Sequence, residues 1–204
     1  MNKRLLSLAC GAVLVTGLVA VTVNDVGART RTARATLATA AGVKVGSVEF
    51  RTDRGHTEVR VRIFGAPGVD AFHGFHIHAN DVVSPTNGEG CIADPAAAAS
   101  TWFVSADGHY NPTAQTHAHH VGDMPVVYVN ADGSVDTRFR IDRIPLGDLE
   151  NKVVILHAGP DNYANIPLGT GASQYTENSP DASTATGRTG NAGDRLLCGV
   201  IAVR

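Results

Sequence analysis

The stretch GSVEFRTDRGHTEVRVRIF (residues 46–64) alternates apolar and polar residues on both sides of a short polar interruption. Alternation with a period of two turns one face of a segment toward a core and the other toward water, which is typical of β-strands. The interruption, Asp53-Arg54-Gly55, is typical of a turn. The stretch therefore predicts an antiparallel hairpin with strands at residues 46–52 and 57–64.

The rest of the chain also favours short strands. Residues 125–141 (PVVYVNADGSVDTRFRI) predict a second hairpin, because Asp132-Gly133 is a dipeptide that tight turns favour. Residues 152–158 and 195–203 are apolar enough to be central strands. We find no convincing amphipathic helix, and residues 81–123 and 159–194 lack any regular period. We therefore expect an all-β domain with two long loops that serve a function.

Residues 1–28 predict a targeting segment rather than part of the fold. Lys3 and Arg4 precede nineteen uncharged residues, 5–23, which is the layout of an export signal. The apolar stretch is nearly long enough to span a bilayer, so an uncleaved membrane anchor is the alternative. Small residues allow cleavage after Ala28 or, as a second candidate, after Ala40. We expect an exported protein (periplasmic, cell-envelope-associated or secreted) whose folded domain is residues 29–204.

Export changes the interpretation of the cysteines. Removal of the targeting segment leaves two, Cys91 and Cys198. In an oxidising compartment such a pair is more typical of a disulfide than of metal ligands. Two buried free thiols are the alternative. The formal net charge of −2 leaves no basic field to attract nucleic acid, so we expect no nucleic-acid partner.

Histidines are concentrated in one of the two long loops. Residues 109–123 (HYNPTAQTHAHHVGD) hold four of the nine histidines in the chain. Three of these imidazoles and a carboxylate make a donor set that suits zinc in a tetrahedral site. The four residues are His109, His117, His120 and Asp123.

Two further segments add imidazoles. In GFHIHAN, His76 and His78 lie two residues apart, so a strand would place both on one face and turn Phe75 and Ile77 into the core. A His-x-His pair is common at copper and zinc sites but is weak evidence alone. His157 ends an apolar strand, where a satisfied core histidine is the simpler alternative. Six histidines and an aspartate in three segments favour a metal centre.

Five motifs together resemble the copper/zinc superoxide dismutases, in particular their bacterial exported branch. They are HGFHIHAND (73–81), GHYNP (108–112), HHVGD (119–123), VVILHAGPD (153–161) and TGNAGDRLLCGVIAV (189–203). The resemblance implies an eight-stranded antiparallel Greek-key barrel with two long functional loops. It also implies copper and zinc as cofactors and superoxide as a small-molecule substrate, which is converted to dioxygen and hydrogen peroxide. A homodimer is compatible with the sequence, which leaves the oligomeric state open.

The resemblance assigns roles to individual residues. The implied copper ligands are His76, His78, His109 and His157, and the implied zinc ligands are His109, His117, His120 and Asp123. His109 would then serve both metals and handle a proton during turnover. Asp161 matches a carboxylate that links the two sites, Arg195 matches a substrate-guiding arginine, and Cys91 and Cys198 match a disulfide. His73 resembles a structural histidine, and His56 and His119 match no ligand position.

Two points set this chain apart from a simple match. Residues 159–194 contain no lysine, so we expect weaker long-range steering of superoxide than in the best-known family pattern. The ligands alone would also suit a non-catalytic protein that stores or delivers copper and zinc. Arg195 favours the enzyme, because metal storage needs no anion guide, although a surface ion pair with Asp194 or a neighbouring residue is the alternative role for this arginine.

Overall fold

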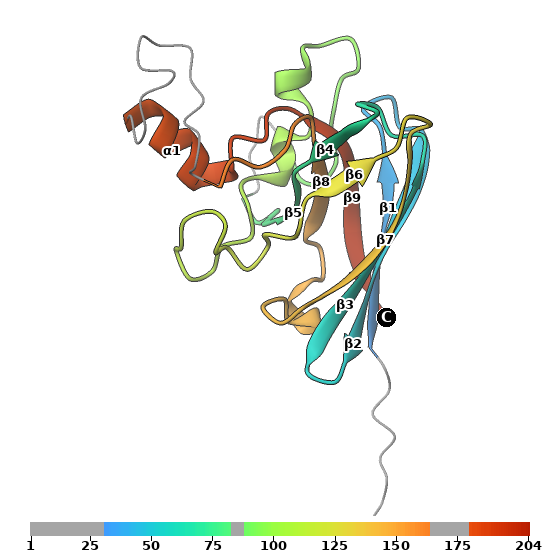
Figure 1. Cartoon of the computed structure of the whole chain (residues 1–204), viewed down its shortest axis with the longest axis vertical. Helices are drawn as coiled ribbons and strands as arrows, with labels where there is room; N and C mark the ends of the chain where they lie inside the picture. The colour runs from blue at the N-terminus through green and yellow to red at the C-terminus, as the bar shows by residue number, and fades with distance from the viewer. Residues whose placement is uncertain (1–30, 83–87, 164–179) are drawn as a thin grey trace, which may run out of the picture.

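The computed structural model describes residues 31–82, 88–163 and 180–204 (Figure 1). Nine strands lie in these ranges: β1 (Thr32–Ala38), β2 (Lys44–Asp53), β3 (His56–Phe64), β4 (Ala71–His73), β5 (Phe75–His78), β6 (Val127–Val129), β7 (Ser134–Ile141), β8 (Val153–His157) and β9 (Arg195–Val203). One α-helix, α1 (Pro180–Thr189), and three short 3₁₀ helices at Ala99–Thr101, Val104–Ala106 and Leu146–Asp148 accompany them. Within the described residues, no helix is long and apolar enough to cross a membrane.

The strands form a large, curled antiparallel sheet and a small second sheet, in a barrel-like arrangement. Seven strands pair in the order β5-β8-β9-β1-β2-β3-β7, and β4 pairs separately with β6. Only Gly74 separates β4 from β5, so these two form one interrupted strand and the predicted eight-stranded barrel is confirmed. Figure 1 shows β1, β2, β3 and β7 on one side and α1 with the long connections on the other.

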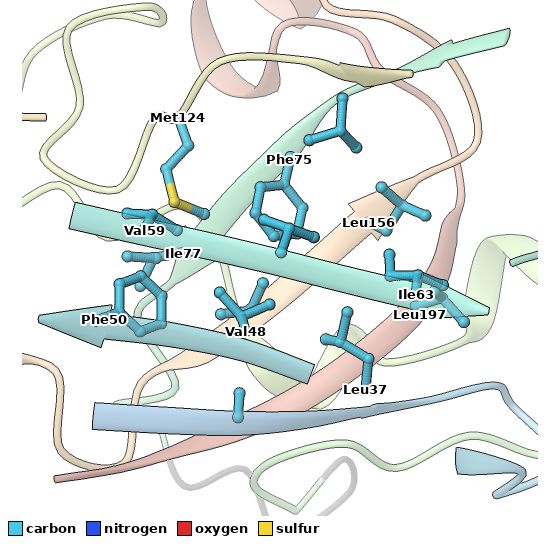
Figure 2. Packing of buried hydrophobic residues seen from close by; sticks show 14 of the residues in the cluster. Leu37, Val48, Phe50, Val59, Ile63, Phe75, Ile77, Met124, Leu156 and Leu197 are labelled. Atoms are coloured by element: carbon cyan, nitrogen blue, oxygen red, sulfur yellow. The ribbon is translucent and has the colours of Figure 1, made fainter. Parts of the chain in front are cut away.

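The first predicted hairpin forms as the alternation indicates. β2 and β3 pair from Gly46–Ile63 to Asp53–His56, and the turn between them consists of Arg54 and Gly55. Both turn residues have positive φ, 50° and 84°, which matches the turn type that suits the twist of paired strands. The inward residues of the two strands are fully or almost fully buried (Val48, Phe50, Val59, Val61, Ile63). Figure 2 shows Val48, Phe50, Val59 and Ile63 among the residues of the main hydrophobic cluster.

The predicted hairpin at residues 125–141 is wrong in its pairing. The turn is present, since Gly133 N–H donates to the carbonyl of Asn130 at 2.8 Å. However, β6 pairs with β4, whereas all eight residues of β7 pair with β3. A turn dipeptide specifies where the chain reverses but leaves the choice of partner strand to the curl of the whole sheet.

Helix α1 is the second departure from the sequence analysis, which found no convincing helix. Polar hydrogen bonds connect it to the loops beside it: Gly187 accepts from the backbone N–H of His117 at 2.8 Å, and Thr186 Oγ1 accepts from Asn162 Nδ2 at 3.2 Å. Its sequence, PDASTATGRT, contains no apolar stripe. Periodicity can reveal a helix only when an apolar face attaches it to the core.

A disulfide fastens the long loop after β5 to the last strand. Cys91 and Cys198 are bonded across 107 positions of sequence, as the cysteine count predicted. The bond lies beside a small apolar cluster in which Phe103 and Ala106 of the loop pack on Ile155 and Cys198 of the sheet. Loop 91–107 is therefore held against β8 and β9 by both a covalent bond and apolar burial.

Reducing the disulfide should lower thermal stability strongly. On the chain-entropy model, a closed loop of this length contributes ~4 to 5 kcal/mol, which corresponds to roughly 10–20 °C in Tm for a domain of this size. The measurement is calorimetry of the metal-free protein with and without reductant, which avoids reduction of copper. The double variant C91S/C198S should show the lower Tm without reductant and no further change with it. Equal Tm values for the oxidised and reduced protein would contradict a stabilising bond.

Candidate metal centre

Strand β5 places two imidazoles on the face opposite the core. His76 and His78 are completely buried, while Phe75 and Ile77, on the other face, belong to the main hydrophobic cluster (Figure 2). This is the orientation that the His-x-His spacing predicts. β5 pairs with β8, which ends at His157, and the Nε2 atoms of His78 and His157 lie 3.3 Å apart.

Backbone carbonyls fix the tautomers of His78 and His157. The Nδ1 of His78 donates to the carbonyl of Asp107 at 2.8 Å, and the Nδ1 of His157 donates to the carbonyl of Gly193 at 3.2 Å. Burial, reinforced by neighbouring imidazoles and Arg195, lowers the pKa of both side chains well below its usual value. Both rings are therefore neutral, and because each carries its proton on Nδ1, neither Nε2 atom carries one.

His109 lies between this pair and a second group of side chains. Its Nδ1 is 2.8 Å from Asp123 Oδ1 and 3.2 Å from His120 Nδ1. Its Nε2 is buried and has no hydrogen-bond partner. Burial lowers the pKa of His109 to about 4, against the opposing effect of Asp123, so the ring is neutral. Isolated β-bridges from His78 to His109 and from His76 to Asp123 bring the loop alongside β5.

The second group surrounds the carboxylate of Asp123. His117 Nδ1 lies 3.1 Å from Oδ2, and His120 Nδ1 lies 3.2 Å from Oδ1. Burial raises the pKa of Asp123, but the adjacent imidazoles of His109 and His117 outweigh it and hold that pKa well below its usual range. Burial likewise opposes protonation of His117, yet Asp123 and Asp161 raise its pKa to about 9. Without a metal, His117 therefore carries a proton, and its positive charge faces the negative charge of Asp123.

Asp161 connects the two groups by contacting one histidine of each, His76 and His117. Both of its oxygens lie 3.0 Å from His76 Nε2, and Oδ2 lies 3.5 Å from His117 Nε2. Its approach depends on two glycines, because a Cβ at Gly74 would lie 2.5 Å from Asp161 Oδ1 and one at Gly190 would lie 2.6 Å from His117 Nε2. The carboxylate thus directs Nδ1 of both histidines away from itself and toward the interior of the centre.

The donor atoms fit a pair of metal ions. Donor atoms within 4.8 Å of one another form two groups: His76, His78, His109 and His157, and His76, His109, His117 and Asp123. The second grouping contains His76 in place of the predicted His120. We favour His120 there, because its Nδ1 is 3.2 Å from both His109 Nδ1 and Asp123 Oδ1, whereas His76 Nε2 faces Asp161.

Unpartnered buried nitrogens provide an independent test of that fit. His76 Nδ1 and His109 Nε2 are buried without a hydrogen bond. The ring nitrogens of His117 also lack a hydrogen bond and face only the carboxylates of Asp123 and Asp161. Leaving a buried polar atom without a partner costs about 1–3 kcal/mol, so several such nitrogens together favour a bound ligand. Neutral imidazole nitrogens beside one carboxylate are the donors that copper and zinc accept. The residues present therefore fit both ions.

Arg195, the first residue of β9, lies next to the imidazoles. Its guanidinium donates to the carbonyl of Phe103 through Nη1 and to that of Asp107 at 2.6 Å through Nη2. Burial lowers its pKa to about 10, with Asp107 partly opposing the shift, so the side chain stays cationic at neutral pH. These partners lie in loop 91–107, and no ion pair with Asp194 is found in the part of the chain that the structure describes.

The remaining histidines agree with their predicted roles. His73 is buried, with Nδ1 2.8 Å from the carbonyl of His157 and Nε2 2.5 Å from that of Gly68, so it braces the backbone at a predicted ligand. His56 and His119 are exposed. Part of the lysine-free loop, residues 164–179, and the targeting segment lie outside the described residues.

Sequence analysis missed two residues that support the centre. Arg143 Nη1 donates to the carbonyls of Ala118 at 2.7 Å and His120 at 3.3 Å, and so holds the loop that contains His117 and His120. Tyr163 stacks on the ring of His117, with centroids 6.0 Å apart. Neither residue belongs to a motif with ligand spacing, so the sequence gives no signal that separates them from ordinary surface side chains.

Comparison with known proteins agrees with this geometry. Residues 44–201 match the family model described as copper/zinc superoxide dismutase. The Cu-Zn superoxide dismutase of Mycobacterium bovis is 34% identical over 173 residues, covering 81% of this chain and 68% of that protein. The Brucella abortus enzyme is 33% identical over 150 residues, covering 68% of this chain and 80% of that protein.

Solved structures show the same fold. The Cu/Zn superoxide dismutase from Brucella abortus matches with a TM-score of 0.55 at 24% identity, covering 83% of this chain and 98% of the other. A SOD-like protein from Bacillus subtilis matches with a TM-score of 0.55 at 22% identity, covering 82% and 96%. Because the family model spans most of the chain and the relatives agree with it, the chain belongs to the copper/zinc superoxide dismutase family.

Proposed function

We propose that this protein converts superoxide to dioxygen and hydrogen peroxide at a copper/zinc centre. The observation that supports it most is the position of His109, whose two ring nitrogens face two different groups of donors. A shared imidazole gives the centre a group that can hold a proton at the place where the reaction needs one. Membership of the family supports the same activity.

We assign the ligands from the free nitrogens. The copper set is His76 through Nδ1 and His78, His109 and His157 through Nε2, because Asp161, Asp107, Asp123 and Gly193 occupy or face the opposite nitrogens. The zinc set is Asp123 together with Nδ1 of His109, His117 and His120. When bound, the metals supply a one-electron couple at the first set and a fixed positive charge at the second.

Arg195, His109 and Asp161 then have separate roles in the reaction. Arg195 is a half-buried cation whose donor fork attracts and orients the anion beside the imidazoles. The overall reaction consumes two superoxides and two protons and yields one dioxygen and one peroxide. His109 takes up a proton at Nε2 in one half-reaction and gives it to the nascent peroxide in the other, while solvent supplies the second proton. Asp161 keeps His76 and His117 oriented throughout.

We further propose that residues 1–28 direct export or anchor the protein at the cell envelope. The Cys91–Cys198 disulfide supports this location, because disulfides persist in oxidising compartments. β1 constrains where processing can occur. It pairs with β2 along one edge and with β9 along the other. Cleavage after Ala40 would remove β1 and expose two unpaired edges, which proteins avoid.

The exported protein should therefore begin at Arg29 or keep its N-terminal segment. Intact mass of the protein recovered from the envelope or medium distinguishes these forms. The variant A28R, which places a large charged residue at the proposed cleavage point, should abolish processing, and A40R should leave it unchanged. A mature chain starting at Ala41 would show that β1 is dispensable and the proposed boundary is wrong.

Metal loading should stabilise the fold, because it satisfies buried nitrogens that lack partners. Zinc at about a thousand times its dissociation constant adds ~4 kcal/mol, which corresponds to roughly 8–16 °C in Tm. Magnesium is the control, since it prefers oxygen ligands. Thermal unfolding of the chelated protein before and after each addition is the measurement. An unchanged Tm with zinc would argue against a zinc site here.

Replacement of His109 separates an enzyme from a metal store. H109A removes one ligand from each proposed set but leaves three on both, so each metal still binds with weakened affinity. Superoxide turnover per bound copper should fall by about a hundredfold or more, because the group that transfers the proton is absent. The readouts are superoxide consumption and metal content of the loaded protein.

H119A is the matched control, since His119 lies in the same loop and is exposed. It should retain both activity and metal. Activity that follows copper content one for one in H109A would refute the proton role of His109. A loaded wild-type protein that consumes superoxide no faster than free copper would favour metal storage or delivery instead.

A further inference from the structure

A single carbonyl oxygen, that of Asp107, connects Arg195 to the imidazole centre. It accepts from Arg195 Nη2 at 2.6 Å and from His78 Nδ1 at 2.8 Å. The position of this oxygen therefore sets the anion guide and a proposed copper ligand relative to each other. The only other carbonyl that accepts from Arg195 in the described residues is that of Phe103.

The backbone at Asp107 adopts a conformation that ordinarily requires glycine. Its φ is 62° and its ψ is −157°, directly after the 3₁₀ helix at Val104–Ala106. Residues with a Cβ are strained in this region and occur there only where the surroundings hold them. Glycine ordinarily occupies such a position, yet here the glycine is the next residue, Gly108. Something must therefore compensate for an aspartate at 107.

The compensating contact is made by the aspartate side chain itself. Its Oδ2 accepts the backbone N–H groups of Asp81 and Val82, both at 2.9 Å. These residues lie three and four positions after the end of β5, so the carboxylate ties loop 91–107 to the segment that leaves His78. Two backbone bonds run beside it, from Ala79 N–H to Gly108 and from Asn80 N–H to Ala106.

We propose that Asp107 is a positioning residue, whose carboxylate clamps the backbone so that its own carbonyl holds Arg195 and His78 in one arrangement. This deepens the proposed function and rests on it, because Arg195 matters only if an anion binds next to the imidazoles. The negative charge of Asp107 would by itself weaken anion binding. Its value here lies in the acceptor geometry of Oδ2, which an amide oxygen can reproduce.

Azide titration of the copper- and zinc-loaded protein, followed by the cupric absorption band, tests the clamp without using turnover. D107A loses the acceptor, so the azide dissociation constant should rise about fivefold, the equivalent of one ordinary hydrogen bond. D107N keeps an acceptor oxygen and should stay within about twofold of wild type. D94A is the control: Asp94 Oδ1 accepts the N–H of Ala96 in the same loop but does not touch Arg195. It should bind azide like wild type.

D107G provides a second test if D107A does not fold, because glycine tolerates the backbone angles but also lacks the acceptor. It should weaken azide binding as D107A does, with copper and zinc content unchanged. The rate of superoxide consumption per copper should fall in parallel in D107A and D107G and recover in D107N.

Three results would overturn the proposal. Azide binding in both D107A and D107G that equals wild type would show that the carboxylate positions nothing. D107N as weak as D107A would show that the acceptor geometry is not the cause. Tighter azide binding in D107A, D107N and D107G would show that the negative charge of Asp107, and not its acceptor geometry, determines the affinity. A wild-type protein that binds azide but does not consume superoxide would count against the proposed activity. The azide titrations of the variants would still decide whether Asp107 acts as a clamp.

Discussion

His109 imposes the strictest constraint on this structure, because one imidazole must face two groups of donors at once. Its Nδ1 is within 3.2 Å of both Asp123 and His120, and its Nε2 is buried toward the opposite group. Because the ring is buried, water cannot replace either group of donors as its hydrogen-bond partner. Every donor side chain on either side must therefore be held in a matching position by the protein around it.

The protein meets this constraint differently on the two sides. On the β5–β8 side, rigid paired strands hold His76, His78 and His157, and backbone carbonyls or Asp161 fix their tautomers. On the loop side isolated β-bridges to β5 replace a continuous strand, and the further supports are the Arg143 guanidinium, the contacts with α1 and the carboxylate of Asp123 itself. Because these supports are fewer than those of a paired strand, we expect the loop side to depend more on bound metal for its order.

Sequence reasoning succeeded where a local pattern has one physical meaning. Alternation in residues 46–64 required a hairpin, and the His-x-His spacing required both imidazoles to lie opposite Phe75 and Ile77. It failed where the decision is made by distant parts of the chain. The pairing of β6 with β4 follows from the curl of the sheet, and α1 attaches through hydrogen bonds to His117 and Asn162 rather than through an apolar face. Arg143 and Tyr163 could not be predicted for the same reason, because their importance comes from contacts with the distant loop that contains His117 and His120.

The account stands most directly on His109 as a ligand shared by two different metals. X-ray diffraction from crystals of the loaded protein, recorded on either side of the copper and zinc absorption edges, locates each metal separately. We expect copper against Nε2 of His109, among His76, His78 and His157, and zinc against Nδ1, among His117, His120 and Asp123. Two metals of which only one contacts His109, or zinc held without it, would contradict the account.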